Sequence, residues 1–286
     1  MIPPRCATVF AMIITDNLPS DASPTLCHMA EAAHLAGQVL MEASRRRHSL
    51  KTTEKTTGDF VSEADMAAEK VISDHLTARY PAHGWLGEES GAAITGSSGL
   101  RWIVDPLDGT TNFLKGLPHW AVSIALCDGE TPLNAIVYDP AKDELFTAEQ
   151  GHGAFLNGQP INVSDEDRLQ SALLATGLPA GGRITYLPHS LQDIATTMPL
   201  TAGLRRWGAA ALDLAYVAAG RLDCYWERNL GAWDIAAGIL LVQEAGGTVT
   251  TLWSANSMVS SGSFLASNGI LHDAVASQLN TDQDLN

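Results

Sequence analysis

Two aspartates stand three residues apart where an apolar segment of the chain ends. Trp102-Ile103-Val104 predicts a buried strand that delivers Asp105 at its end, and Pro106 stiffens the exit. Asp108 returns a second carboxylate within one turn, close enough to share one hard cation with Asp105. Because carboxylate oxygens are the ligands that Mg²⁺ prefers in proteins, this segment predicts a magnesium site.

The residues that follow Asp108 predict an anion site beside the cation. Gly109 has no side chain and lets the backbone approach a ligand. Thr110 and Thr111 can begin a helix, whose free N–H groups bind anions such as phosphate. A dozen residues therefore combine oxygen ligands for Mg²⁺ with a phosphate cradle.

Two further acidic positions fit the same site. Glu88-Glu89 follows the short apolar segment 85–87, and Asp234 precedes the apolar stretch 235–245. Taken singly, an acidic pair is usually a solvated loop and an aspartate before a helix is usually a cap. Carboxylates gathered at the ends of apolar segments, with no basic partner nearby in sequence, repel one another unless a cation neutralises them. We therefore expect Glu88 and Asp234 to join the site.

Other catalytic constellations are poorly represented in the sequence. No Gly-x-Ser-x-Gly motif is present, and the cysteines form no Cys-x-x-Cys pair, which excludes a thiolate zinc cluster. The histidines are scattered, and His119, next to the acidic motif, is most simply a structural residue. A covalent aspartyl-phosphate would form on Asp105, but the neighbouring Asp108 favours metal binding.

Composition restricts the classes of partner. The chain has 286 residues, of which 45% are hydrophobic, so it is ample for a sizeable core. Its net charge is −15, which disfavours direct contact with nucleic acid or with an anionic membrane. If the substrate is an anion, a bound metal ion must make the electrostatic potential at the binding site positive in this negatively charged protein.

Helix and strand signals alternate without a regular period. Ser23-Pro24 begins one predicted helix, and the capping box Ser62-Glu63-Ala64-Asp65 begins a second that Pro81 ends. Further helices are predicted over 209–219 and 234–245 and from about 271, and strands over 121–127, 134–138, 248–252 and 264–266. Residues 177–183 form a softer region rich in Gly and Pro. The fold class predicted is α/β (α+β), a layered sandwich rather than a barrel.

The chain divides into three predicted segments. Residues 1–22 are expected to be a loose extension, because their apolar run 9–14 is too short for a signal sequence or a membrane span. Residues 23–160 form an N-terminal α+β half that binds metal, and residues 161–286 form a C-terminal α/β half that completes the active site. With widely spaced cysteines and no membrane span, the expected location is the cytoplasm.

The acidic motif resembles that of a known family. Asp105-Pro-Leu-Asp-Gly-Thr-Thr-Asn-Phe113, preceded by Gly87-Glu-Glu-Ser90 and followed by Trp233-Asp-Ile-Ala-Ala-Gly238, is similar to the inositol monophosphatase family. Agreement extends from about residue 59 to 247, and residues 205–214 and 244–247 resemble bacterial members. The resemblance implies a layered αβαβα sandwich of the sugar-phosphatase type, a homodimer, two or three Mg²⁺ per site and, as in many members, inhibition by Li⁺.

The resemblance also implies residue roles. Metal ligands would be Glu88, Asp105, Asp108, Asp234 and the Leu107 carbonyl. Asp105 would bridge two metals, Glu88 would hold the metal that carries the attacking water, and Asp108 and Asp234 would hold the metal that faces the leaving oxygen. Phosphate would lie on Gly109, Thr110 and Thr111, while Asp65 and Thr110 would place the water. The wall that holds the substrate alcohol would comprise Gly208, Ala209, Ala210 and Glu227, with Arg205 orienting Glu227.

The function implied is hydrolysis of myo-inositol monophosphate or a similar polyol phosphate. Glu227 suits the hydroxyls of a neutral polyol and would repel a second phosphate. Ala209 lacks the hydroxyl that some relatives carry there, so fine specificity is open. Histidinol phosphate, fructose 1,6-bisphosphate and a 3′-phosphonucleotide remain alternative substrates. A regulatory partner of the RNA-processing or transcription machinery is an alternative of another class.

Overall fold

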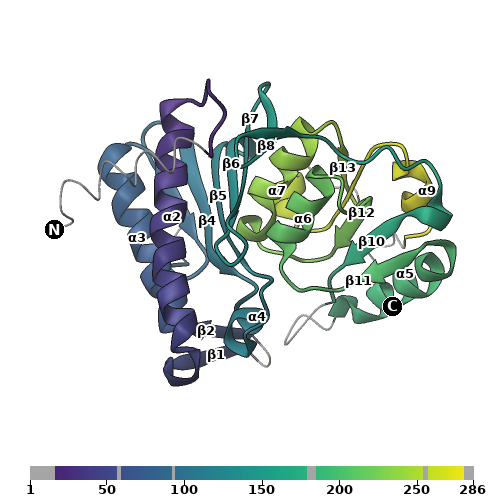
Figure 1. Cartoon of the computed structure of the whole chain (residues 1–286), viewed down its shortest axis with the longest axis horizontal. Helices are drawn as coiled ribbons and strands as arrows, with labels where there is room; N and C mark the ends of the chain where they lie inside the picture. The colour runs from purple at the N-terminus through teal and green to yellow at the C-terminus, as the bar shows by residue number, and fades with distance from the viewer. Residues whose placement is uncertain (1–16, 57–58, 92–93, 179–184, 254–256, 280–286) are drawn as a thin grey trace.

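The computed structural model describes residues 17–56, 59–91, 94–178, 185–253 and 257–279. These residues form five layers, alternately helical and stranded (Figure 1). Helices α2 and α3 cover one face of a seven-stranded sheet, α6 and α7 lie between this sheet and a five-stranded one, and α5 and α9 cover the far face of the second sheet. The predicted αβαβα sandwich is confirmed.

The helices vary in length from one turn to six. Their bounds are α2 Pro24–Arg45, α3 Glu63–Arg79, α4 Thr110–Lys115, α5 Leu187–Thr197, α6 Ala210–Ala218, α7 Ala232–Glu244, α8 Met258–Ser261 and α9 His272–Ala276. Short 3₁₀ helices span Arg47–Ser49, Leu169–Ser171 and Met198–Leu200.

The strands form a hairpin and two larger sheets. The hairpin pairs β1 (Thr52–Thr56) with β2 (Asp59–Ser62). The seven-stranded sheet has the order β3 (Gly84–Gly87), β4 (Leu100–Asp108), β5 (Ala121–Asp128), β6 (Thr131–Asp139), β7 (Glu144–Glu149), β8 (Gly153–Leu156) and β9 (Gln159–Ile161). The five-stranded sheet has the order β11 (Gly203–Arg205), β10 (Leu173–Thr176), β12 (Cys224–Glu227), β14 (Phe264–Ser267) and β13 (Thr248–Thr251).

Both N-terminal helices begin at the predicted caps. The Ser23 side chain accepts a hydrogen bond from the Leu26 N–H, and Pro24 occupies the first turn of α2. Ser62 and Asp65 form the predicted capping box of α3. The predicted glycine stops also hold, because Gly220 and Gly246 follow α6 and α7 with positive φ, a conformation that glycine adopts without strain.

The packed part of the chain begins before residue 23. Leu18 is only 7% exposed and belongs to the core that α2, α3 and the seven-stranded sheet share. The loose extension predicted over 1–22 is therefore not loose at Leu18, while residues 1–16 lie outside the described residues.

The middle layer forms the largest core. Every residue of α6 is buried, and α7 is buried from Ile235 to Val242. Both helices pack against the seven-stranded sheet and the five-stranded sheet. Both helices are therefore buried between the two sheets. Among the described residues, no helix is long and apolar enough to cross a membrane.

Candidate active site

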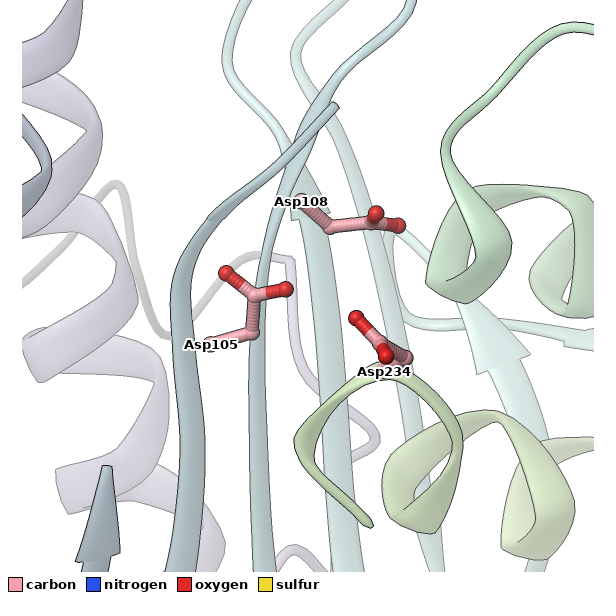
Figure 2. A group of neighbouring side chains, drawn as sticks. All are labelled: Asp105, Asp108 and Asp234. Carbon is pink, nitrogen blue, oxygen red and sulfur yellow. The ribbon is translucent and has the colours of Figure 1, made fainter. Parts of the chain in front are cut away.

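Carboxylates from both halves of the chain meet in a cleft of about 570 Å³. Asp105 and Asp108 come from β4, and Asp234 comes from the first turn of α7 (Figure 2). Each of these three residues offers a carboxylate oxygen, and the three oxygens lie within 4.8 Å of one another. The structure thus brings together acids that are more than 120 residues apart in sequence.

An irregularity in β4 lets both of its aspartates face the cleft. The strand does not end at Asp105 as predicted; it continues to Asp108. Residues three apart on a regular strand point to opposite faces of the sheet. The pairing of β4 with β5 shifts register between Asp105 and Asp108, and the Leu107 N–H donates to Asp105 Oδ1 at 2.9 Å. This bulge turns both carboxylates to one side, which is the usual role of a bulge beside an active site.

Glu88 reaches the same point from the neighbouring strand. Strands β3 and β4 are parallel, and Gly87 pairs with Val104, so Glu88 follows its strand beside Asp105. Its carboxyl group shares a hydrogen bond with that of Asp105 and lines the cleft. Glu88 therefore joins the three aspartates, as predicted.

Burial and mutual repulsion raise the pKa values of the aspartates of β4. Burial raises the pKa of Asp105 well above its usual range, and the charges of Glu88 and Asp108 raise it further. Burial and the charge of Asp234 likewise raise the pKa of Asp108, although the Ala211 N–H, 2.7 Å from Oδ2, opposes this effect. A buried all-oxygen set with this excess of negative charge fits a hard divalent cation.

A hydroxyl and a buried carboxylate lie beside the acids. The Thr110 hydroxyl donates to Asp65 Oδ1 at 3.0 Å. The other oxygen of Asp65 accepts the Ser62 N–H at 2.9 Å and the Ser62 hydroxyl. Burial raises the pKa of Asp65, while these hydrogen bonds oppose the rise. Asp65 therefore caps α3 and fixes Thr110 with the same carboxylate.

The predicted phosphate cradle is part of the cleft wall. Helix α4 begins at Thr110, and Gly109 precedes it with φ of 88°. Gly109, Thr110, Thr111 and Leu107 all line the cleft. A side chain on Gly109 would be strained by that φ and would lie 3.1 Å from the Ala209 side chain.

The segment before α6 forms the opposite wall in part as predicted. Gly208 and Ala210 line the cleft, whereas Ala209 is buried beneath it. The Asn112 amide donates to the Trp207 carbonyl and to the His119 carbonyl, each at 2.8 Å. Asn112 thus ties α4 to this wall, a contact that sequence reasoning missed because the partners are carbonyl groups.

Glu227 lies at the end of β12 and faces the cleft, but Arg205 does not orient it. Arg205 is exposed on β11, and its guanidinium donates to the Leu204 carbonyl at 3.2 Å. The Tyr225 hydroxyl donates to Glu227 instead. A side chain on Gly177 would overlap the Glu227 carboxylate, which lies 1.7 Å from the Cβ position. Tyr225 and Gly177 are thus the missed neighbours of Glu227.

Arg206, the neighbour of the predicted Arg205, is a basic residue that lines the cleft beside Gly208. Arg205 is the last residue of strand β11 and is not among the residues that line the cleft. Most of the soft region predicted over 177–183 lies outside the described residues, but Gly177 and Leu178 line the cleft.

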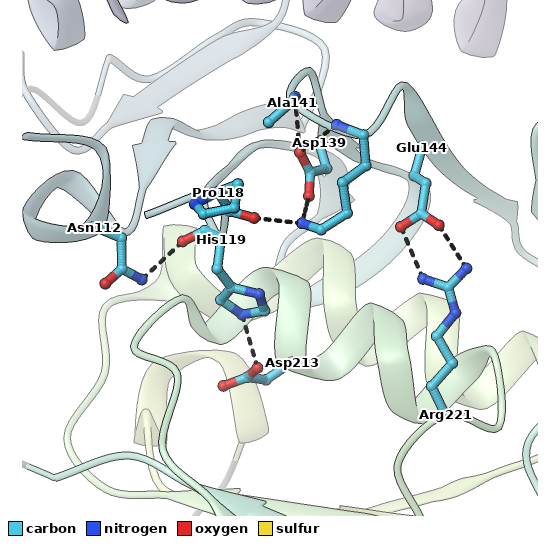
Figure 3. A network of polar contacts seen from close by, with 9 residues as sticks. Asn112, Pro118, His119, Asp139, Ala141, Glu144, Asp213 and Arg221 are labelled. Carbon is cyan, nitrogen blue, oxygen red and sulfur yellow. Dashed lines mark hydrogen bonds and ion pairs between the residues drawn. The ribbon is translucent and has the colours of Figure 1, made fainter. Parts of the chain in front are cut away.

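His119 supports the wall from behind. Its Nε2 lies 3.1 Å from the carboxylate of Asp213, in the first turn of α6 (Figure 3). Burial raises the pKa of Asp213, and the contact with His119 opposes the rise. Nearby, Lys142 bridges the Pro118 carbonyl and Asp139. The His119 side chain therefore holds α6 rather than contacting the carboxylate cluster, which agrees with its structural interpretation.

Comparisons with known proteins give one family. The sequence profile of the inositol monophosphatase family matches residues 21–284. The inositol-1-monophosphatase of Rhizobium meliloti is 46% identical over 241 residues, which are 84% of this chain and 90% of that protein. The Nus factor SuhB of Pseudomonas aeruginosa is 45% identical over 249 residues, which are 86% and 92% of the two chains.

The fold agrees with a solved structure of similar sequence. The extragenic suppressor protein suhB from Bartonella henselae superposes with a TM-score of 0.86 at 42% identity. The alignment covers 92% of this chain and all of the Bartonella chain.

Proposed function

Because this chain belongs to the inositol monophosphatase family, we propose that it is a Mg²⁺-dependent phosphomonoesterase that hydrolyses myo-inositol monophosphate or a similar polyol phosphate. The observation that carries the proposal is the convergence of Asp105, Asp108 and Asp234 within 4.8 Å, with Glu88 beside them. Bound magnesium, two or three ions per site, would neutralise the phosphate dianion and acidify a water molecule.

The protein's own groups would hold these ions and the ester. Glu88, Asp105, Asp108, Asp234 and the Leu107 carbonyl are the proposed metal ligands. Gly109, Thr110 and Thr111 are the proposed phosphate contacts, since they line the cleft beside the acids.

Thr110 and Asp65 would orient the attacking water. Hydrolysis joins the water oxygen to phosphorus and breaks the bond from phosphorus to the ester oxygen, which takes a proton from solvent water and leaves as the alcohol. With its proton donated to Asp65, the Thr110 oxygen can accept a hydrogen bond from water. The raised pKa of Asp65 makes it a better proton acceptor than an ordinary aspartate. A proton can therefore pass from water through Thr110 to Asp65.

Glu227 supports a polyol as the alcohol. Its carboxylate can accept hydrogen bonds from hydroxyl groups, and its charge would repel a second phosphate. This disfavours fructose 1,6-bisphosphate and a 3′-phosphonucleotide with a second phosphate, whereas histidinol phosphate, with its ammonium group, remains compatible. A panel of these esters assayed with Mg²⁺ tests the proposal, and turnover that persists in EDTA would contradict it.

A regulatory role is the second candidate, because the relatives carry two different names. Proteins named inositol-1-monophosphatase are 43–46% identical, and proteins named Nus factor SuhB are 43–45% identical. A partner in the transcription machinery would be a protein rather than RNA, given the net charge of −15. The presence of all four acidic residues, Glu88, Asp105, Asp108 and Asp234, favours catalysis over a purely regulatory role. A folded protein that hydrolyses no ester of the panel would favour the regulatory role.

We further propose a homodimer in the cytoplasm, with sensitivity to Li⁺. Sedimentation at the mass of one chain would contradict the dimer. The cysteines of the described residues, Cys27, Cys127 and Cys224, have free thiols, the state that the cytoplasm maintains. Burial raises the pKa of Cys127 to about 12, which keeps this thiol inert.

A further inference from the structure

Helix α3 presents a second buried acid one turn beyond Asp65. Glu69 follows Asp65 by four residues, so both side chains lie on the same face of α3. Glu69 is 6% exposed and Asp65 is fully buried. Burying a carboxylate is unfavourable unless it accepts strong hydrogen bonds, so we expect hydrogen-bond donors next to the Glu69 carboxylate.

The turn that carries Glu88 supplies these donors. Glu69 Oε2 accepts the Glu89 N–H at 2.8 Å, and Oε1 accepts the Ser90 N–H at 3.0 Å. Two consecutive backbone N–H groups thus bind the two oxygens of one carboxylate, which fixes both the position and the orientation of the turn. Glu88 is the residue immediately before these two donors.

Gly87 leaves room for the Glu69 carboxylate next to the turn. A Cβ at position 87 would lie 2.6 Å from Glu69 Oε2, so any side chain there would push the carboxylate away. The Glu88 N–H donates to the Val104 carbonyl at 3.1 Å, next to Asp105. Glu69 and β4 therefore hold the turn between them, with the Glu88 side chain beside the aspartates.

We propose that Glu69 is a positioning residue for the metal site, acting through Glu88. Helix α3 then serves both catalytic segments: Asp65 fixes Thr110, and Glu69 fixes the turn of Glu88. Partners of this kind, which orient a metal ligand without touching the metal, typically change metal affinity by about 10- to 100-fold when removed. The inference rests on the proposed function, because it takes Glu88 as a metal ligand.

The test measures Mg²⁺ binding by calorimetry on the purified protein without substrate. Glu69→Gln keeps the size of the side chain but replaces one acceptor with an N–H₂ group that faces a donor. We expect its dissociation constant for Mg²⁺ to rise about 10- to 100-fold. Asp74→Asn is the matched control, since it removes one negative charge from the same helix at an exposed position paired with Lys70. The control should bind Mg²⁺ as the wild type does.

A second variant separates positioning from stability. Gly87→Ala should weaken Mg²⁺ binding because it displaces the Glu69 carboxylate. In the Glu69→Ala background it should add little further loss, because the group that it displaces is gone. High Mg²⁺ should restore most of the activity of Glu69→Gln, since its metal ligands are all present.

The outcomes distinguish the two proposals. Wild-type protein that binds no Mg²⁺ would overturn the proposed function. Wild-type binding with an unchanged dissociation constant in folded Glu69→Gln would overturn the role of Glu69 alone. A variant that loses only thermal stability in EDTA, with its Mg²⁺ affinity intact, would show that Glu69 is merely structural. If Glu69→Gln does not fold, Gly87→Ala carries the same comparison.

Discussion

The Tyr225 hydroxyl donates to the carboxylate of Glu227, two residues further along β12. Residues two apart on a strand share a face of the sheet, so the side chains of Tyr225 and Glu227 are neighbours on one face. Tyr225 is fully buried, and burial together with the charge of Glu227 raises its pKa well above the usual value. The hydroxyl therefore stays protonated and is a permanent donor to Glu227.

Replacing Tyr225 by Phe should weaken the hold on Glu227 without changing the shape of the core. A hydrogen bond to a charged group contributes about 1.5–3 kcal/mol. We expect KM for inositol phosphate to rise while kcat changes less. Arg205→Ala is the control and should leave both constants unchanged, because Arg205 bonds to Leu204. Impairment of the Arg205 variant alone would contradict the role that we assign to Tyr225.

Replacing Glu227 by Gln should alter substrate choice. Its contact with substrate hydroxyls should exist in the ground state and in the transition state alike, so its loss should raise KM more than it lowers kcat. We expect kcat/KM for inositol phosphate to fall about 10- to 150-fold, the equivalent of one charged hydrogen bond. Hydrolysis of p-nitrophenyl phosphate, which has no ring hydroxyls, should fall much less. Equal losses on both substrates would mean that Glu227 acts on the metals or on the fold.

Replacing Asp105 by Asn should abolish catalysis and preserve the fold. The carboxylate is buried among like charges, so its neutralisation relieves repulsion in the metal-free protein. We expect kcat to fall by several orders of magnitude, and the rise in unfolding temperature on adding Mg²⁺ to vanish. Circular dichroism and thermal unfolding in EDTA check that the variant is native. Full activity of this variant would refute the proposed metal site.

The stability of the metal-free protein should fall as the pH rises. Asp105 and Asp108 have raised pKa values in the folded state, so above the ordinary aspartate value of 3.8 the native protein keeps protons that the unfolded chain releases. Where the native state binds more protons, stability decreases with increasing pH, up to the raised pKa values. Metal ligands must be deprotonated, so the stabilisation by Mg²⁺ should grow over the range from pH 3.8 up to the raised pKa values. Thermal unfolding in EDTA and in Mg²⁺ across this range measures both trends, and a pH-independent difference between them would contradict the assignment.

Replacing Leu18 by Ala tests where the packed chain begins. Leu18 is buried in the core beside α2, so its truncation should lower the free energy of unfolding by about 2–5 kcal/mol. Urea denaturation measures the loss. A variant as stable as the wild type would restore the expectation of a loose segment through residue 22.

Local signals in the sequence predicted the helix starts and the acidic motif. Ser23, Ser62 and Asp65 act through neighbours in sequence, so their capping roles are visible in the sequence itself. The layered fold followed from the mixture of helix and strand patterns and, in its five layers, from the family resemblance. The hairpin of β1 and β2 was missed, because its strands consist largely of polar and charged residues without apolar alternation.

The contacts that position the site could not be predicted, because they depend on tertiary structure. Glu69 contacts Glu89 and Ser90 about twenty residues away. The contact of Tyr225 with Glu227 differs, because both residues lie in one strand and their two-residue spacing could have indicated it. The bulge in β4 was also missed, since Pro106 after an apolar strand predicts an exit rather than a continuation. Side-chain partners of backbone N–H and carbonyl groups that lie far apart in sequence have no signature in residue type.

The carboxylate cluster combines residues that are synthesised early with one that is synthesised late, which affects how the chain folds during synthesis. Asp105 and Asp108 leave the ribosome about 130 residues before Asp234. At roughly 5–20 residues per second, this leaves about 6–26 s in which the nascent chain has only part of the carboxylate cluster. Under the proposed function, Mg²⁺ would stabilise the chain fully only after α7 has been made and has docked against the seven-stranded sheet. A purified fragment that ends before residue 234 should gain less protease resistance from Mg²⁺, relative to EDTA, than the full chain gains.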